Sequence, residues 1–295
     1  MRWAQLLGPL SRSTETDLTA WFAELSQSAA QASSCEFAML GGRLSATPGL
    51  AFFAGYQAAL RALVPTAPAG IGAFCLTEKR SSKAADIHTQ LQAGKITGQK
   101  DFVIAGNAAQ WLLVIAREDA PQHPCPLRAV VVSTAHPNLR LQTRPALPLI
   151  PDIAHSHVQF DQVPCDILAG DGWQDYSKAF RTLEDGHVLA ALCAWLYGHS
   201  LLDRWPQDLQ LQLIALLAGL KESLQQPCNT PATHLLLGSL IAQFARLQNP
   251  ISQALTTYSS PDTTLMWQRD KAVLDLATHA RIRRLEVALS ALALI

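Results

Sequence analysis

Two adjacent carboxylates stand at the beginning of a predicted helix and could serve as general bases. Glu184 and Asp185 open the apolar stretch 183–202, and a carboxylate within hydrogen-bond reach of an acidic C–H can remove its proton. The helix macrodipole also favours carboxylates at this end of a helix, which explains both residues without catalysis. His187 and His279 titrate near neutral pH and are further candidates. We take Glu184 as the candidate catalytic residue.

A basic segment earlier in the chain could bind an anion. Lys79, Arg80 and Lys83 fall within the segment 79–83. Their charges could contact phosphate groups, because a charge-assisted hydrogen bond needs no special turn. A solvated basic loop explains the same residues. The sequence leaves both interpretations open.

The charge and composition exclude several classes of protein. The 295 residues carry 23 Lys and Arg against 23 Asp and Glu, so the formal net charge is zero. A nucleic-acid partner is not expected, because such proteins need a basic surface to neutralise phosphates. The hydrophobic content of 49% supplies a sizeable core and excludes disorder as the main state. The longest apolar run, 188–202, is shorter than the ~20 residues of a membrane span and predicts a buried helix.

The cysteines and the first residues favour a cytoplasmic protein. No CxxC pair or nearby histidine accompanies the cysteines, so we expect reduced, packed thiols and no metal site. The N-terminal residues turn polar before an apolar stretch of signal-peptide length develops. The six cysteines are Cys35, Cys75, Cys125, Cys165, Cys193 and Cys228.

Hydrophobic periodicity divides the chain into three parts and predicts the α+β class. Residues 1–70 predict an N-terminal helical domain, 71–172 a small central antiparallel β-sheet or barrel, and 173–295 a C-terminal four-helix bundle. The expected strands include a hairpin of 87–92 with 95–104, then 111–116, 127–133 and 157–160. Proline-rich breaks at Pro121, Pro124 and Pro126 separate two of them. The expected C-terminal helices are 183–202, 209–224, 234–247 and 267–294, with breaks at 225–231 and 248–261.

Three segments in this order resemble the acyl-CoA dehydrogenase family. The family opens its β domain with a C-x-T-E stretch before a glycine-rich turn, which is similar to FCLTEKRSSKAADIHTQL at 74–91. A later G-x-K-x-F-I-T-N-G pattern resembles GKITGQKDFVIAGNAAQWLLVIARE at 94–118. The family leaves its β domain through the pattern F-D-x-V-x-V-P followed by L-G-x-x-G. The start of 157–191 in this chain, HVQFDQVPCDILAGDG, is similar to it. The resemblance covers about residues 70–200 well and the flanks loosely.

The resemblance implies a flavoenzyme that uses FAD to oxidise the CH–CH bond of an acyl-CoA thioester. In the family a base removes the α-proton while the β-hydride passes to the flavin. The chain looks like a shortened, divergent member, with less N-terminal helix and less bundle than usual. The resemblance also implies assembly through the C-terminal bundle, as a homo-dimer or tetramer or with a related subunit.

Four residues fall on positions that contact the cofactor in the family. Thr77 matches a threonine at the flavin pyrimidine edge, and Phe102 matches the aromatic residue that covers the ring. Ile104 replaces a threonine that hydrogen-bonds flavin N5, so that stabilising contact should be missing. Arg204 is the one arginine placed to reach the flavin diphosphate of a neighbouring subunit. The segment 79–83 replaces family glycines, and we expect its backbone to follow a different path.

Neither usual position of the family glutamate base carries a carboxylate here. The two positions fall on Gly186 and Thr278. We therefore expect the dehydrogenase activity to be weak or altered, with Glu184 as the substitute base.

Two alternatives follow from the missing base. The chain could be a catalytically degenerate, cofactor-poor scaffold subunit whose apolar faces around Leu237, Leu240 and Phe244 form an interface. It could also be a flavin-dependent monooxygenase, because relatives of this fold that use reduced flavin and oxygen lack the glutamate.

Overall fold

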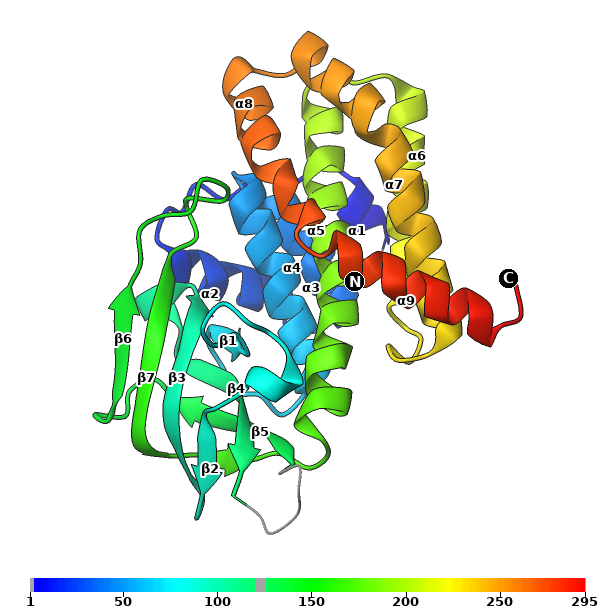
Figure 1. Cartoon of the computed structure of the whole chain (residues 1–295). Coiled ribbons are helices and arrows are strands. Elements are labelled where there is room, and N and C mark those ends of the chain that lie inside the picture. The colour runs from blue at the N-terminus through cyan, green and yellow to red at the C-terminus, as the bar shows by residue number, and fades with distance from the viewer. Residues whose placement is uncertain (1–2, 120–125, 295) are drawn as a thin grey trace.

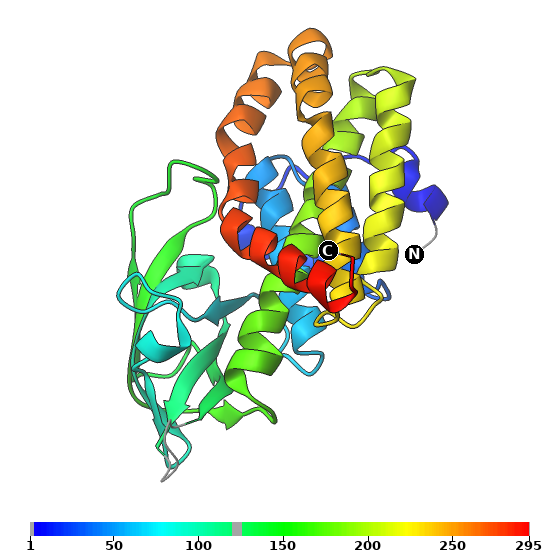
Figure 2. The same ribbon diagram turned by 45° about the vertical axis from the view of Figure 1, so that its right-hand side comes forward.

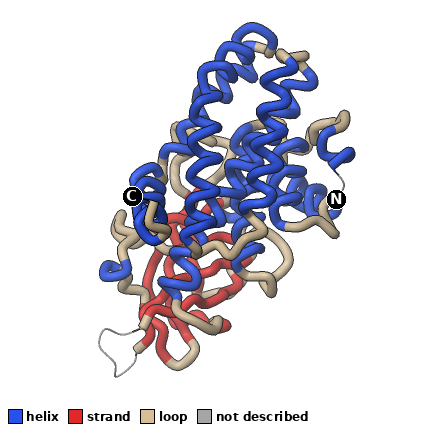
Figure 3. The backbone as a smooth tube through the Cα atoms, turned by 90° about the vertical axis from the view of Figure 1, so that its right-hand side faces the viewer, coloured by secondary structure: helices blue, strands red, loops and turns tan. Residues whose placement is uncertain are grey.

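A small β layer lies beside a larger body of helices in the computed structural model, which describes residues 3–119 and 126–294 (Figure 1). The strands gather at one end of the molecule, and helices extend from them to the other end (Figure 3). The expected α+β composition is confirmed.

The first part of the chain is helical, as expected, and it packs directly on the long helix α5 (Ala179–Leu202). Two glycines make this close approach feasible. A Cβ at Gly42 would lie 2.0 Å from the carbonyl oxygen of Ala191, and one at Gly55 would lie 2.6 Å from the Cα of Val188. The helices are α1 (Trp3–Leu7), α2 (Leu18–Ser28), α3 (Ser34–Leu44) and α4 (Pro48–Leu63).

Eight strands form one sheet within the described residues, in the order β6-β7-β3-β2-β4-β5-β8, with β1 paired to β4. The expectation of a purely antiparallel unit is wrong, because β4 runs parallel to both β1 and β2. Strand β3 reverses the chain direction and the next turn reverses it again, so β4 regains the direction of β2. The strands are β1 (Gly72–Cys75), β2 (Gln90–Gln92), β3 (Lys95–Ile104), β4 (Trp111–Glu118), β5 (Leu127–Ser133), β6 (Leu139–Thr143), β7 (His155–Pro164) and β8 (Asp166–Ile167).

The expected hairpin is confirmed as β2 and β3. Ala93 and Gly94 connect these strands with φ of 48° and 72°, the left-handed conformation that a two-residue hairpin turn requires. The strand at 127–133 has the predicted bounds, and the one at 157–160 lies within β7. Of the predicted proline breaks, Pro121 and Pro124 lie outside the described residues.

The C-terminal part contains five α-helices in the described range, so the four-helix prediction is wrong. A π-helical turn at Gly172–Lys178 leads directly into α5, which begins earlier than expected. The predicted helix at 267–294 is divided by a 3₁₀ segment, Lys271–Asp275. The remaining helices are α6 (Gln207–Ser223), α7 (Pro231–Tyr258), α8 (Pro261–Asp270) and α9 (Thr278–Ala291).

Helix α7 continues through Pro250, where the sequence suggested a break. A proline inside a helix removes one backbone hydrogen bond. Ile251, Ala254 and Leu255, immediately after it, are all buried, and burial of their apolar side chains offsets that loss. Packing therefore overrides the local preference of proline.

Helix α9 crosses α5 because two of its arginines bind one carboxylate there (Figure 2). Arg281 Nε donates to Asp185 Oδ1 at 2.8 Å, and Arg284 donates to Asp185 Oδ2. The side chain of Asp185 is 4% exposed. A buried carboxylate needs such partners, so these bonds hold the last helix against α5.

A buried ion pair links the loop after β1 to the interior of the sheet. Lys100 is fully buried, and its Nζ donates to Glu78 Oε1 at 2.6 Å and to the carbonyl of Ile115 at 2.6 Å. Glu78 also accepts from the backbone amides of His88 and Thr89. Burial lowers the pKa of Lys100, although Glu78 opposes this shift. The pair fixes both ends of the 78–89 loop.

No helix of the described ranges is both long and apolar enough to cross a membrane. The five described cysteines are unpaired thiols, and Cys125 lies outside the described residues.

Removing one partner of the buried pair should destabilise the fold more than removing both. We expect Lys100→Met to lower the free energy of unfolding by about 3–5 kcal/mol, because Glu78 would remain buried without its cation. Lys100→Met combined with Glu78→Gln should cost less than the sum of the two single changes. Urea unfolding measures both quantities.

The control for this pair is Lys95→Met, which changes an exposed lysine on the same strand. Its effect should stay within ~0.5 kcal/mol. Strictly additive costs for Lys100 and Glu78 would contradict an energetic link between them.

Candidate functional site

Thr77 and Phe102 are brought together by the backbone of β3. The amide of Asp101 donates to the carbonyl of Thr77 at 2.8 Å, and Phe102 is the next residue. The Phe102 ring is 40% exposed and stands edge-on to the ring of His155. The Thr77 hydroxyl has no hydrogen-bond partner in the described part of the chain. The Arg144 guanidinium lies over the Phe102 ring, 5.4 Å from its centroid, so this corner of the sheet combines a partly exposed aromatic ring with a cation.

Ile104 ends β3 two residues after Phe102, beyond an irregularity in the strand pairing between Lys100 and Val103. Its side chain is nearly buried, and its backbone pairs with His155 of β7. It can offer apolar contact and no hydrogen bond. The position therefore lacks the donor that the resemblance would place there.

The basic segment after Thr77 takes a left-handed backbone without glycine. Lys79 and Arg80 have φ of 48° and 64°, which costs roughly 1–2 kcal/mol for each such residue. A pair of backbone bonds between Glu78 and Ser81, and the Arg80 amide bonded to Asp101 Oδ2 at 2.7 Å, stabilise the turn. The backbone at Lys79 and Arg80 thus adopts positive φ values although neither residue is glycine.

The side chains of this segment are exposed to solvent. Lys79, Arg80 and Lys83 all lie on the surface, which agrees with the solvated-loop interpretation. The carbonyl of Ser82 accepts a hydrogen bond from Arg181 of α5 at 3.2 Å. The loop thereby rests against the beginning of the helix that carries Glu184.

Arg204 lies far from the other predicted contacts within the chain. It is an exposed residue just after α5. The axial distance from Glu184 to Leu202, eighteen residues at 1.5 Å each, is ~27 Å. Within a single chain, Arg204 therefore does not lie in the same site as Thr77, Phe102 and Ile104.

Glu184 stands on the face of α5 that turns towards α4 and β1. Phe180, one turn earlier on α5, packs against Tyr56 of α4 and Phe74 of β1, with ring centroids 5.3 and 4.6 Å apart. Part of the Glu184 side chain remains accessible, but protein surrounds its carboxyl. Burial, and then the neighbouring Asp185, raise the pKa of Glu184 to about 8, while three arginines act in the opposite direction.

This environment is suited to proton transfer. The Glu184 carboxyl makes no hydrogen bond or ion pair with the residues that the structure describes. A carboxyl with a pKa near the working pH can both take up and release a proton. The expectation that Glu184 and Asp185 lie at a helix N-terminus is wrong, because α5 begins at Ala179. Desolvation therefore governs the acidity of Glu184.

The other candidate bases have structural roles or stand apart. His187 is fully buried, with Nδ1 2.7 Å from the Leu183 carbonyl and Nε2 2.9 Å from Ser34 Oγ. Since a carbonyl only accepts, Nδ1 carries the proton, and burial lowers the pKa of His187 to about 4. Asp185 is held by the arginines of α9. His279 is exposed in the first turn of α9.

The two usual glutamate positions are unsuited to a base. Gly186 faces α6, and a Cβ there would lie 2.6 Å from Cδ2 of Leu224, which would have to move. Thr278 begins α9, and its hydroxyl donates to the carbonyl of Asp275 at 2.8 Å.

Glu78 and Lys100, which position the Thr77 loop, were not predicted from the sequence. A lysine in the middle of a strand and a glutamate directly after Thr77 were the available signals. A group of cations around the beginning of α5 was also not predicted, and the run Arg281, Arg283 and Arg284 was its sequence signal.

Comparison with known proteins supports the resemblance at the level of fold. No protein-family model and no curated protein sequence matches the chain. Among solved structures, butyryl-CoA dehydrogenase from Megasphaera elsdenii is similar, with a TM-score of 0.64 at 14% identity over 92% of this chain and 86% of that one. FkbI, described for biosynthesis of the methoxymalonyl extender unit of a polyketide, gives 0.62 at 18% over 88% and 84%. PigA with FAD and proline gives 0.63 at 12% over 88% and 82%.

These likenesses extend over most of each chain. The chain therefore has the fold of the acyl-CoA dehydrogenases and related FAD-dependent dehydrogenases, at low sequence identity.

Proposed function

We propose that the protein is an acyl-CoA dehydrogenase-like FAD oxidoreductase whose base is Glu184. The observation that carries this proposal is the unpartnered Glu184 carboxyl, with its pKa raised to about 8, on the face of α5 towards α4 and β1. The substrate class is an acyl thioester of coenzyme A or a related carrier, whose α-proton is acidic. Activity should be weak or altered, because neither usual glutamate position holds a carboxylate.

The protein's own residues suit the cofactor in part. The exposed Phe102 ring offers an apolar surface to a flat ring system, and the free Thr77 hydroxyl offers a polar contact to its edge. Ile104 offers apolar contact only. When bound, FAD supplies the acceptor for a hydride from the β-carbon of the substrate.

The remaining chemistry belongs to Glu184. Its deprotonated carboxylate takes the α-proton and then holds it on an oxygen atom. Arg281, Arg181 and Arg284 lower the pKa of Glu184 against the effect of burial and Asp185, and so keep part of the carboxyl ionised near neutral pH. Tyr56 of α4 is close to it, since burial and then Glu184 raise the pKa of Tyr56.

Assembly into a homo-dimer or tetramer, or with a related subunit, is part of the proposal. The apolar face around Leu237, Leu240 and Phe244 cannot supply the interface, because all three side chains are buried within the chain. Leu211, Leu236 and Leu265 are exposed on the same group of helices and are the better candidates.

Ile104 lacks the hydrogen-bond donor that the resemblance places beside the flavin. This favours a cofactor-poor scaffold subunit as the second candidate. A visible spectrum distinguishes the two candidates. Purified protein that is colourless and cannot be reconstituted with FAD supports the scaffold. Bands of oxidised flavin that an acyl-CoA does not bleach, with oxygen consumed once the flavin is reduced, support a monooxygenase.

Glu184→Gln should abolish bleaching of the flavin by an acyl-CoA. The substitution keeps the shape of the side chain and removes the proton acceptor, so we expect a loss of 10²-fold or more in the reduction rate. Stopped-flow absorbance of the FAD-loaded protein measures it. Glu222→Gln, an exposed glutamate of α6, is the matched control. An unchanged rate in Glu184→Gln removes Glu184 from consideration.

The rate should also depend on pH through the same group. Because only the carboxylate accepts a proton, the reduction rate should rise with pH and level off above about 8, following the raised pKa of Glu184. Folding is opposed when pH rises from the unfolded pKa towards this value, since the native state prefers the protonated form. Glu184→Gln should therefore be the more stable protein above pH 8, by on the order of 1–2 kcal/mol. A flat pH profile would contradict the assignment.

Restoring a hydroxyl at position 104 should speed the reaction. Ile104→Thr supplies a donor where the resemblance places one, and a single positioned donor is worth up to ~10² in rate. Ile104→Val has the same shape without the hydroxyl and is the matched control. Equal rates of flavin reduction in the two variants would show that the missing donor does not limit the reaction.

A further inference from the structure

A buried tyrosine of α4, Tyr56, has a hydroxyl proton that no described residue accepts. Tyr56 is 6% exposed, and its oxygen lies 2.7 Å from the amide nitrogen of Phe74. Because an amide N–H can only donate, the tyrosine oxygen is the acceptor in this contact and its own proton stays available. No acceptor for that proton lies in the part of the chain that the structure describes. A buried donor without an acceptor costs about 1–3 kcal/mol, and a ligand that accepts the proton would remove this cost.

The position of the Tyr56 hydroxyl is fixed by β1. This strand pairs with β4 along one edge, and side chains of α4 bind its other edge. Gln57 exchanges two hydrogen bonds with the backbone of Gly72, at 2.7 and 3.1 Å. Tyr56 accepts the amide of Phe74 in the same way, and its ring packs edge-on to Phe180 at 5.3 Å. The hydroxyl is therefore held in place before any ligand binds, which makes a donor effective in catalysis.

Glu184 and Tyr56 lie at the same level of the contact between α4 and α5. Phe180, Glu184 and Val188 are four residues apart, so they occupy successive turns on one face of α5. The turn before Glu184 touches the Tyr56 ring through Phe180. The turn after it touches the neighbouring residue of α4, because a Cβ on Gly55 would lie 2.6 Å from the Cα of Val188. Burial, and then Glu184, raise the pKa of Tyr56, which agrees with this placement and keeps the hydroxyl protonated.

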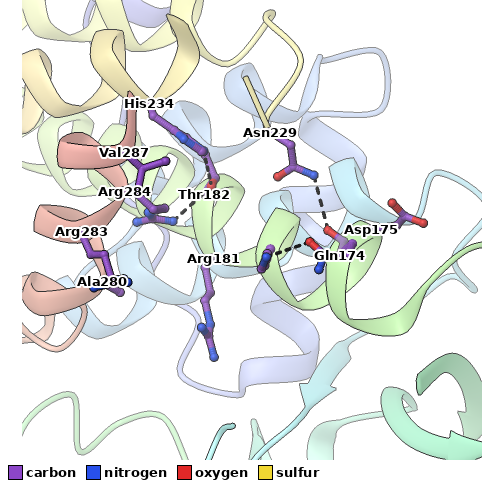
Figure 4. Close-up of a pocket in the computed structure, with 11 residues that line it drawn as sticks. Gln174, Asp175, Arg181, Thr182, Asn229, His234, Ala280, Arg283, Arg284 and Val287 are labelled. Atoms are coloured by element: carbon purple, nitrogen blue, oxygen red, sulfur yellow. Dashed lines mark hydrogen bonds between the residues drawn. The ribbon is translucent and has the colours of Figure 1, made fainter. Parts of the chain in front are cut away.

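Two arginines near the base, Arg181 and Arg284, already donate to protein acceptors. Arg284 donates to Asp185 and to Thr182 Oγ1, the latter at 3.1 Å (Figure 4). Arg181 donates to the carbonyl of Ser82 at 3.2 Å. These guanidinium groups are engaged in the fold, whereas the proton of the α4 hydroxyl is not.

We propose that the Tyr56 hydroxyl binds the carbonyl oxygen of the substrate thioester while Glu184 removes the α-proton. The inference rests on the proposed role of Glu184 as the base. When the α-C–H bond breaks, its proton passes to a carboxylate oxygen of Glu184, its electron pair forms the enolate, and negative charge develops on the carbonyl oxygen. A hydrogen bond from a positioned O–H stabilises that charge without transfer of the hydroxyl proton. Tyr56 is then a catalytic residue supplied by α4.

Exchange of the α-protons of acetyl-CoA in D₂O tests this inference with the full chain. Acetyl-CoA has no β-carbon, so no hydride can leave and proton NMR measures proton removal alone. We expect Tyr56→Phe to slow the exchange about 10²-fold. Tyr197→Phe is the matched control, because it removes another buried tyrosine hydroxyl, which donates to the carbonyl of Leu7 at 2.9 Å. Its exchange rate should not change, and urea unfolding checks that both variants fold.

A second measurement detects the hydrogen bond itself and does not require proton removal. The NMR signal of acetyl-CoA labelled with ¹³C at the carbonyl should move downfield on binding to the unmodified protein. It should move equally in Glu184→Gln, which retains the donor, and much less in Tyr56→Phe. A signal that stays at its free position in the unmodified protein, or that moves equally in Tyr56→Phe, overturns the inference.

The exchange rates separate this inference from the proposed function. Exchange that Glu184→Gln abolishes and Tyr56→Phe leaves intact overturns the role of Tyr56 and retains the base. Exchange that Glu184→Gln leaves intact removes Glu184 as the base, and with it the step that Tyr56 would assist.

Discussion

The buried contact between Lys100 and Glu78 is the constraint on which the candidate site depends. Two charges inside a sheet are tolerated only when every donor and acceptor is satisfied, and here backbone carbonyls and amides complete the set. The contact ties the loop that follows Thr77 to the strand that carries Phe102 and Ile104. It thereby anchors one end of the left-handed turn at Lys79 and Arg80, which the backbone bonds between Glu78 and Ser81 and the bond from the Arg80 amide to Asp101 also stabilise.

Helix α5 organises the rest of the molecule by giving each side chain of one short stretch a different neighbour. Glu184 turns towards α4 and the sheet, Asp185 towards α9, Gly186 towards α6 and His187 towards α3. Of these groups, Glu184 alone keeps a carboxyl without a partner among the described residues. Neighbouring positions on α5 thus differ in role: Glu184 has a carboxyl available for proton transfer, whereas Asp185, Gly186 and His187 serve packing and hydrogen bonding.

The sequence was sufficient for the elements that have local signals and insufficient for features that tertiary packing decides. Periodicity and turn residues predicted the hairpin at Ala93 and Gly94 and the strand at 127–133, because these signals are local. It could not predict that α7 continues through Pro250, since burial of later residues decides this. The raised pKa of Glu184 was also out of reach, because it arises first from burial of the carboxyl, which the tertiary packing decides.

The attachment of α9 has a consequence for the acidity of the carboxyl beside it. Arg281 and Arg284 donate hydrogen bonds to Asp185 and also lower the pKa of Glu184. If the last helix swings away, both cations depart while Asp185 and the apolar walls remain. The pKa of Glu184 would then rise further, and less of the carboxyl would be ionised at neutral pH. The position of α9 thus influences how readily Glu184 can take up a proton.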